Sequence, residues 1–210
     1  MAKRTKDVAP VKASARSKAS NEKSGMDRVY QLRISLVESE PEIWRRTLVP
    51  GKMSLGALHD VIQGVMGWDG GHLHQFILNR DTRFSEPTFG LEDTENEHKA
   101  RLCDIAPRAG KAFGYEYDFG DSWLHRIKVE KIVDREEKTP PLPVCVDGAN
   151  ACPPEDCGGL WGYYNMLEAI DDPANESHEE MLEWLGGGFD PTAFDPAQVN
   201  KRLEWMRKKE

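Results

Sequence analysis

The sequence predicts an α+β fold, in which strands and helices pack around one shared core. Apolar and polar residues alternate from Val29 to Val37 and again in two runs between residues 113 and 129. Apolar residues recur at helical spacing between Ser54 and Met66, and short helical patterns follow Gly158. A period of two indicates half-buried strands and a period of 3.6 indicates amphipathic helices, so both element types contribute one face to the core.

The first half of this domain is expected to run strand, strand, helix, strand. A turn follows the strand over 29–37, and residues 43–49 then predict a second strand, antiparallel to the first. Ser54 is placed to cap the helix, and Gly67 ends it before a strand over 72–79. This order of elements occurs in β-grasp folds, so the expected start of the domain is β-grasp-like. Element order does not fix which strands become neighbours in the sheet.

The second half is expected to hold a second β-hairpin and a C-terminal group of short helices. Residues 80–100 are polar and lack periodicity, which predicts a long surface loop. Alternating residues on both sides of Phe119-Gly120-Asp121-Ser122 predict the hairpin. The expected helices are one with Trp161, Tyr164, Leu167 and Ile170 on one face, one with Ser177 and Glu180 as a capping box, and one that starts at Asp195-Pro196.

Charge divides the chain into a tail and a body. Residues 1–25 contain seven Lys or Arg and two acidic residues, a net charge of +5, whereas the whole chain of 210 residues carries −8. We therefore expect a disordered basic tail over residues 1–26 and a single domain over residues 27–210. The tail is either a solvated extension or a weak electrostatic contact to nucleic acid. The acidic body, with a net charge of −13, is unsuited to follow a phosphate backbone.

The sequence also indicates a compartment. No apolar run approaches the roughly 18 residues of a membrane-spanning helix. The basic N-terminus lacks the apolar stretch of a secretory signal. We therefore expect a cytoplasmic protein without membrane contact, whose four cysteines are reduced.

Three of the cysteines form the first candidate site. Cys145, Cys152 and Cys157 fall within thirteen residues, with Pro153 and Pro154 between the last two. Thiolates at such a turn are compatible with a zinc loop that takes a fourth ligand from Cys103 or a histidine. The competing interpretation is a rigid turn with buried or free thiols, because no second Cys-x-x-Cys pair is present.

Histidines and carboxylates form the second candidate site. Imidazole nitrogens and carboxylate oxygens are suitable ligands for a catalytic divalent metal with an open water position. The competing interpretation makes the histidines hydrogen-bonded residues of a strand face and the acidic residues caps of backbone N–H groups at turns. Two of the histidines, His72 and His74, are expected on the same face of their strand. The candidates are His72, His74, Asp118, Asp121, His125, Glu155 and Asp156.

Other common catalytic motifs are absent from the sequence. There is no Gly-x-Ser-x-Gly elbow, and no glycine loop followed by Lys and Ser or Thr. Tryptophans without a basic groove favour core packing over base stacking. This expectation covers Trp44, Trp68, Trp123, Trp161 and Trp184.

Several short motifs, taken together and in order, resemble the plasmid pRiA4b ORF-3-like family over roughly residues 27–205. They are Tyr30-Gln31-Leu32-Arg33-Ile34, Ile43-Trp44-Arg45-Arg46, His72-Leu73-His74-Gln75-Phe76, the segment from Tyr117 to His125, the segment from Cys152 to Gly159, and Trp184-Leu185-Gly186. The resemblance implies a largely uncharacterised protein of a family found on plasmids and chromosomes, some of whose members are passenger proteins of insertion elements. Family members often lack a cysteine at the place of Cys157, which argues against a zinc loop. A resolvase label attached to some members has no counterpart here, because no serine nucleophile among arginines and no helix-turn-helix is found.

Three functions follow as expectations. The first is a non-catalytic accessory or interaction protein with an unknown protein partner. The second is a metal-dependent, hydrolase-like enzyme that uses the His and carboxylate candidates. The third is a DNA-associated regulator that contacts DNA through residues 1–25.

Overall fold

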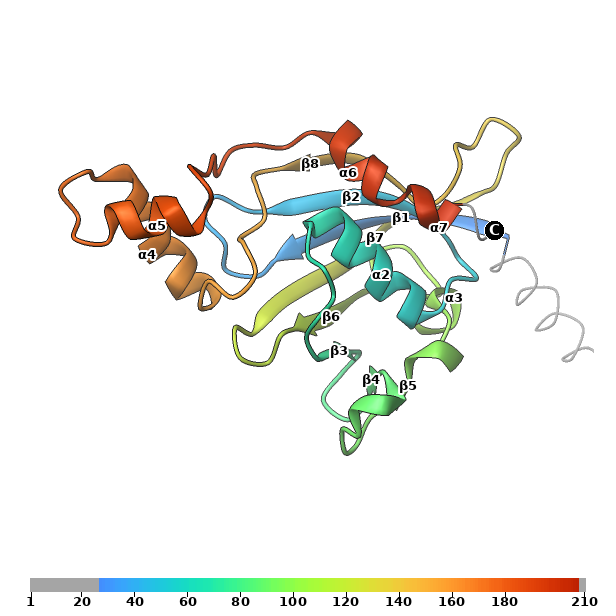
Figure 1. Cartoon of the computed structure of the whole chain (residues 1–210). Coiled ribbons are helices and arrows are strands. Elements are labelled where there is room, and N and C mark those ends of the chain that lie inside the picture. Colours follow the sequence, from blue (N-terminus) through green and yellow to red (C-terminus); the bar gives the residue numbers. More distant parts are fainter. Residues whose placement is uncertain (1–26, 208–210) are drawn as a thin grey trace, which may run out of the picture.

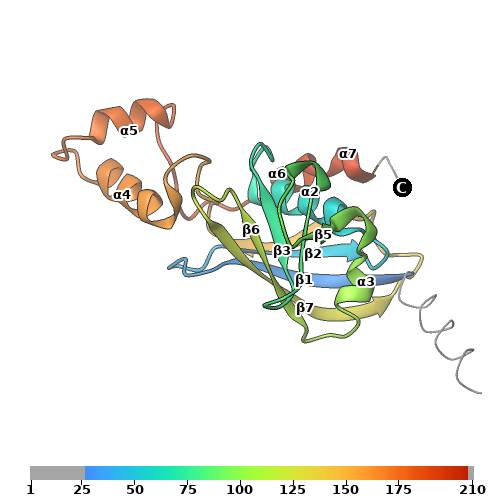
Figure 2. The same ribbon diagram turned by 90° about the horizontal axis from the view of Figure 1, so that it is seen from below.

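The computed structural model describes residues 27–207 and shows an eight-stranded mixed sheet with helices over one face and at one end (Figures 1 and 2). The strand order is β5-β4-β3-β6-β7-β1-β2-β8, and all neighbours are antiparallel except β4 and β5. The strands are β1 (Arg28–Leu36), β2 (Trp44–Pro50), β3 (His74–Ile77), β4 (Arg83–Ser85), β5 (Glu95–Asn96), β6 (Ala112–Tyr117), β7 (Trp123–Asp134) and β8 (Val144–Ala149). The predicted tail over 1–26 lies outside the described residues.

Short helices connect the strands and close the chain. α2 and α6 contact each other, and Figure 1 shows both over one face of the sheet. No helix in residues 27–207 is long and apolar enough to cross a membrane. The helices are α2 (Leu55–Met66), α3 (Leu102–Ile105), α4 (Gly159–Asp171), α5 (His178–Trp184), α6 (Pro196–Arg202), α7 (Glu204–Arg207) and the 3-10 helices η1 (Pro87–Phe89) and η2 (Glu97–Lys99).

The two predicted hairpins are confirmed, and both pair at the centre of the sheet. β1 pairs with β2, and β6 pairs with β7 so that Tyr117 lies opposite Trp123. Alternation places the apolar residues of each strand against α2 and the polar residues on the other face. β6 and β7 lie between β3 and β1. The α+β class is therefore confirmed, whereas a β-grasp assignment is not shown.

The core forms where α2 packs on the central strands. The Ser54 hydroxyl accepts a hydrogen bond from Ala57 N, and Gly67 ends the helix in the left-handed conformation, as its capping residues predict. Among the tryptophans, Trp68 and Trp123 are buried as expected. The largest fully buried side chains of this core include Trp123, Tyr30, Tyr115, Tyr117 and Phe76.

Three local expectations are wrong. Residues 80–100 do not form a plain surface loop; they contain β4, η1, β5 and η2 and bury Phe84 and Glu97. The Ser177 side chain makes no capping hydrogen bond to α5, because its backbone is not extended. Its own N–H donates a hydrogen bond to Asn175 Oδ1. Trp161 is 79% exposed, because α4 buries a neighbouring face, and Trp184 is 48% exposed, so neither packs in the core as expected. That buried face carries Tyr163, Met166 and Ala169.

Candidate metal centre

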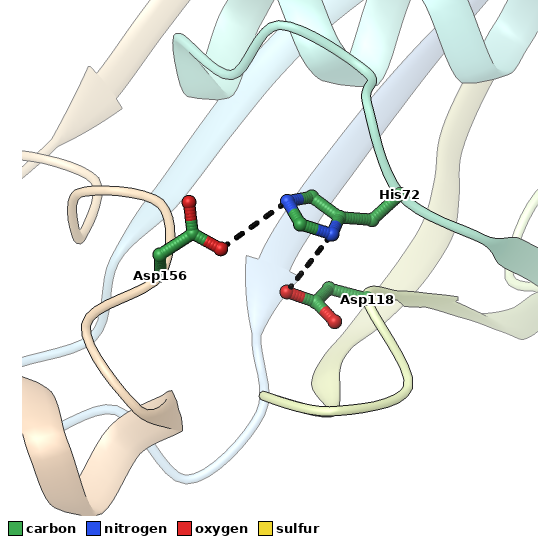
Figure 3. Close-up of side chains that lie close together, drawn as sticks. All are labelled: His72, Asp118 and Asp156. Atoms are coloured by element: carbon green, nitrogen blue, oxygen red, sulfur yellow. Dashed lines mark ion pairs between the residues drawn. The ribbon is translucent and has the colours of Figure 1, made fainter.

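Three segments that are far apart in the sequence meet at one end of the sheet. They are the loop between α2 and β3, the turn between β6 and β7, and the loop between β8 and α4. His72 Nδ1 lies 3.6 Å from Asp118 Oδ2, and His72 Nε2 lies 3.4 Å from Asp156 Oδ1 (Figure 3). One donor atom of each residue lies within 4.8 Å of the other two. The structure thus brings together three of the seven His and carboxylate candidates.

The two carboxylates occupy unusual backbone conformations. Asp118 has φ 55° and Asp156 has φ 59°, both in the left-handed region that Asp tolerates better than most residues. The Asp118 turn is held by its own side chain, since Oδ1 accepts a hydrogen bond from Gly120 N at 3.0 Å. Such conformations persist only where the surrounding structure fixes them, and they cluster at functional sites.

Two further acidic candidates brace the segments instead of facing His72. Asp121 Oδ2 accepts a hydrogen bond from Gly158 N at 3.1 Å, which ties the β6–β7 turn to the loop before α4. Glu155 accepts from the Tyr117 hydroxyl at 2.5 Å and from Asp69 N at 3.0 Å. Burial, reinforced by the Glu155 carboxylate, raises the pKa of Tyr117. These contacts agree with the interpretation of acidic residues as caps and fix the loops that carry the three ligand candidates.

The remaining histidine candidates lie outside this group. β3 begins at His74, so His72 sits in the preceding bend and the expected shared face does not exist. His74 is buried and its Nε2 lies 2.9 Å from Glu97 Oε2. His125 is fully buried, its Nδ1 lies 2.9 Å from the Trp123 carbonyl oxygen, and burial lowers its pKa to about 4. Both are core residues.

The three predicted zinc thiols are not gathered into a ligand group. Within residues 27–207 the clusters with ligand spacing contain no cysteine, and all four cysteines are free. Cys145 is buried on β8 and lies 3.5 Å from the Asp147 carbonyl oxygen, whereas Cys152 and Cys157 lie in the following loop. Burial raises the pKa of each of the three thiols, that of Cys157 to about 12. They agree with the competing interpretation of a rigid turn with packed thiols.

A second group of possible ligands comes from the segment that was expected to be a loop. Glu86, Glu97 and His98 have donor atoms within 4.8 Å of one another and line a cleft of about 680 Å³ beside α2. His59 stacks on His74 in the same cleft, with ring centroids 3.6 Å apart. Burial and the neighbouring His74 lower the pKa of His59 to about 3. No periodic pattern in the sequence marks these residues.

The contact between the two loops predicts an effect of adding one methyl group. Gly159 has φ +70°, and a Cβ there would lie 2.6 Å from the Asp121 carbonyl oxygen. Gly186 has φ +72° with open space around it, so it is a matched control for backbone strain. We expect Gly159→Ala to lower the free energy of unfolding by about 2 kcal/mol more than Gly186→Ala in urea denaturation. Equal decreases in the free energy of unfolding for the two variants would show that the loops move apart to accept the methyl group without an energetic cost.

Comparisons with known proteins give the chain its relatives. Residues 28–198 match the family described as plasmid pRiA4b ORF-3-like protein. The uncharacterized protein y4hQ of Sinorhizobium fredii (strain NBRC 101917 / NGR234) is 37% identical over 188 residues, which cover 86% of this chain and 95% of that protein. The crystal structure of the protein of unknown function MM3350 from Methanosarcina mazei Go1 is similar with a TM-score of 0.73 and 38% identity, over 82% of this chain and 97% of that one.

Proposed function

We infer that this chain, which belongs to the plasmid pRiA4b ORF-3-like family, binds a divalent cation through His72, Asp118 and Asp156 and uses it in a hydrolytic reaction. The observation that carries this proposal is the convergence of three ligand side chains from three separate segments. Both carboxylates are held there in left-handed backbone conformations.

The spacing of the donor atoms suits a cation. The distances of 3.4 Å and 3.6 Å between the His72 ring nitrogens and the carboxylate oxygens are longer than the usual N···O distance of an N–H···O hydrogen bond. Neighbouring ligands of a tetrahedral ion with bonds of about 2.1 Å lie about 3.4 Å apart. These two distances involve opposite ring nitrogens of His72, whereas a single ion binds only one of them. One donor atom of each residue nevertheless lies within 4.8 Å of the other two, so all three residues can reach one ion.

Accessibility favours a catalytic site over a closed structural one. The Asp156 side chain is 72% exposed and that of His72 is 35% exposed, whereas that of Asp118 is 13% exposed. Three protein ligands leave a coordination position for water on the exposed side. When bound, the cation would lower the pKa of that water and so supply a nucleophile near neutral pH. Asp121 and Glu155 would hold the ligand loops in place without touching the ion.

Metal titration of the purified, untagged protein tests the site. We expect one Zn²⁺ or Mn²⁺ to bind to it in isothermal calorimetry, with at least tenfold weaker affinity in His72→Ala. His98→Ala is the matched control, because it removes a histidine from the Glu86 group and leaves the first site intact. Unchanged binding in His72→Ala together with loss in His98→Ala would move the site to the second group.

Ion pairing without metal is the alternative, and it makes a different prediction. If His72 only links the two loops electrostatically, added metal leaves the melting temperature unchanged in every variant. If it is a ligand, metal raises the melting temperature of the native chain and not that of His72→Ala. Hydrolytic use further predicts metal-dependent cleavage of ester or phosphoester probes that is lost in Asp156→Asn. A metal-loaded protein that cleaves none of these probes would leave a binding site without hydrolysis.

The interaction role expected from the sequence is favoured by a different observation. The surface of α4 and α5 is acidic and carries two exposed tryptophans. A role for this surface does not require the metal site.

A further inference from the structure

Helices α4 and α5, with the turn over 172–177 that joins them, form an acidic lobe at one end of the sheet. The two helices pack on each other, and Figures 1 and 2 show them standing out from the strands. Trp161 and Trp184 are 79% and 48% exposed, and both line a hollow of about 560 Å³ with Met166 and Met181. Large exposed tryptophans beside flexible methionines are typical of binding surfaces.

The charge around this hollow has one sign. The sequence contains no Lys or Arg between Lys138 and Lys201, and it contains twelve Asp or Glu in that interval. Two of the exposed carboxylates, those of Asp156 and Glu168, line the hollow itself. The exposed acidic residues on and next to the lobe are Asp156, Glu168, Asp171, Asp172, Glu176, Glu179, Glu180 and Glu183.

This combination selects a cationic occupant. An exposed indole face attracts the ammonium of Lys or the guanidinium of Arg, and the surrounding carboxylates add Coulomb attraction. The same field repels phosphates, so nucleic acid is a poor occupant. The hollow includes Asp156 of the proposed metal site, but its tryptophans and the other carboxylates of the lobe attract a cation without bound metal.

We propose that the acidic lobe binds the basic N-terminal segment of the same chain, residues 1–25. That segment carries seven Lys or Arg and a net charge of +5, opposite to the lobe. β1, which follows the segment, has nine residues and spans about 30 Å. A segment of 25 residues reaches about 80 Å when extended, so it is long enough to return along the sheet.

A peptide titration tests this contact. The probe is a synthetic peptide of residues 1–25, titrated into a protein that lacks these residues. The truncated protein retains the whole family match from residue 28, and the solved relative, aligned over 97% of its chain, covers 82% of this one. We expect a change in tryptophan fluorescence on binding, and at least a tenfold loss of affinity between about 50 mM and about 200 mM salt.

Two variants of the truncated protein locate the contact on the lobe. We expect about tenfold weaker binding in Trp161→Ala/Trp184→Ala and in Glu179→Gln/Glu180→Gln/Glu183→Gln. The matched control is Glu92→Gln/Asp93→Asn/Glu95→Gln, which removes three exposed acidic residues in and before β5, at the opposite edge of the sheet from β8. We expect it to bind the peptide as tightly as the truncated protein without substitutions. Equal binding by all variants would place the contact elsewhere and overturn the proposal.

Peptide binding by the full-length protein tests whether residues 1–25 of the intact chain occupy the lobe. If it does, added peptide must compete with it, and the full-length protein binds the peptide at least fivefold more weakly than the truncated one. Equal affinity of the two proteins would show that the lobe is open in the intact chain, and the proposal would be wrong. Absence of peptide binding to the truncated protein would overturn it as well.

Discussion

Replacement of Glu97 by Ala is expected to lower the free energy of unfolding by about 3 kcal/mol or more. The Glu97 carboxylate is almost fully buried, and its Oε2 lies 2.9 Å from Nε2 of His74, whose ring is also buried. Removing one partner leaves a buried polar group unpaired, which costs more than the pair contributes. Among the described residues His74 Nδ1 has no hydrogen-bond partner, so the ring would lose its remaining hydrogen bond to them.

A conservative variant separates this loss from simple loss of volume. Glu97→Gln keeps the length of the side chain and can still pair with His74, so we expect it to recover more than half of the lost free energy of unfolding. Urea denaturation of both variants measures the difference. A loss below about 1 kcal/mol in Glu97→Ala would show that His74 finds water or another partner.

Acidification should destabilise the fold through His125. Burial holds the pKa of His125 at about 4, compared with 6.5 for an exposed histidine, and the ring packs edge-on against Trp68 at 5.3 Å. Between these two pH values the unfolded chain binds a proton that the folded chain excludes. Stability therefore falls as pH decreases through this interval, by about 1.4 kcal/mol per pH unit, and levels off below the folded pKa.

The slope of stability against pH is the measurement. His125→Asn preserves a donor for the Trp123 carbonyl oxygen and does not titrate, so its slope between about pH 6 and pH 5 should be smaller by about 1.4 kcal/mol per pH unit. His59, whose pKa is lowered to about 3, adds a similar slope in both proteins and cancels in the comparison. Identical slopes would mean that His125 binds its proton within the folded core at the same pH as in the unfolded chain.

Hydrophobic periodicity and capping residues in the sequence were sufficient to predict several local elements. The alternation over 29–37 and over 113–129 predicted strands that form, and Ser54 and Gly67 predicted the ends of α2. These signals are reliable because each depends on neighbouring residues and a single hydrophobic face. The same logic failed at α4, where the choice between two similar faces depends on α5 and leaves Trp161 exposed.

The sequence predicted the types of residue in the candidate site but not which of them would come together. His72, Asp118 and Asp156 were three of seven possible ligands, and nothing in their spacing separates them from His74 or His125. Their proximity depends on the loop before α4 docking onto the β6–β7 turn through Asp121 and Gly158. Glu97 was missed because a short irregular segment, without period, was folded into the core by contacts distant in sequence.

The sequence by itself determined the α+β class, the hairpins, the α2 caps and the family, because these depend on local pattern and on ordered motifs. The tertiary structure alone decided the strand neighbours, the histidines that became core, and the three side chains that meet at one end of the sheet. The physical reason is that sheet order and loop docking are fixed by pairings between distant residues, which local periodicity does not encode.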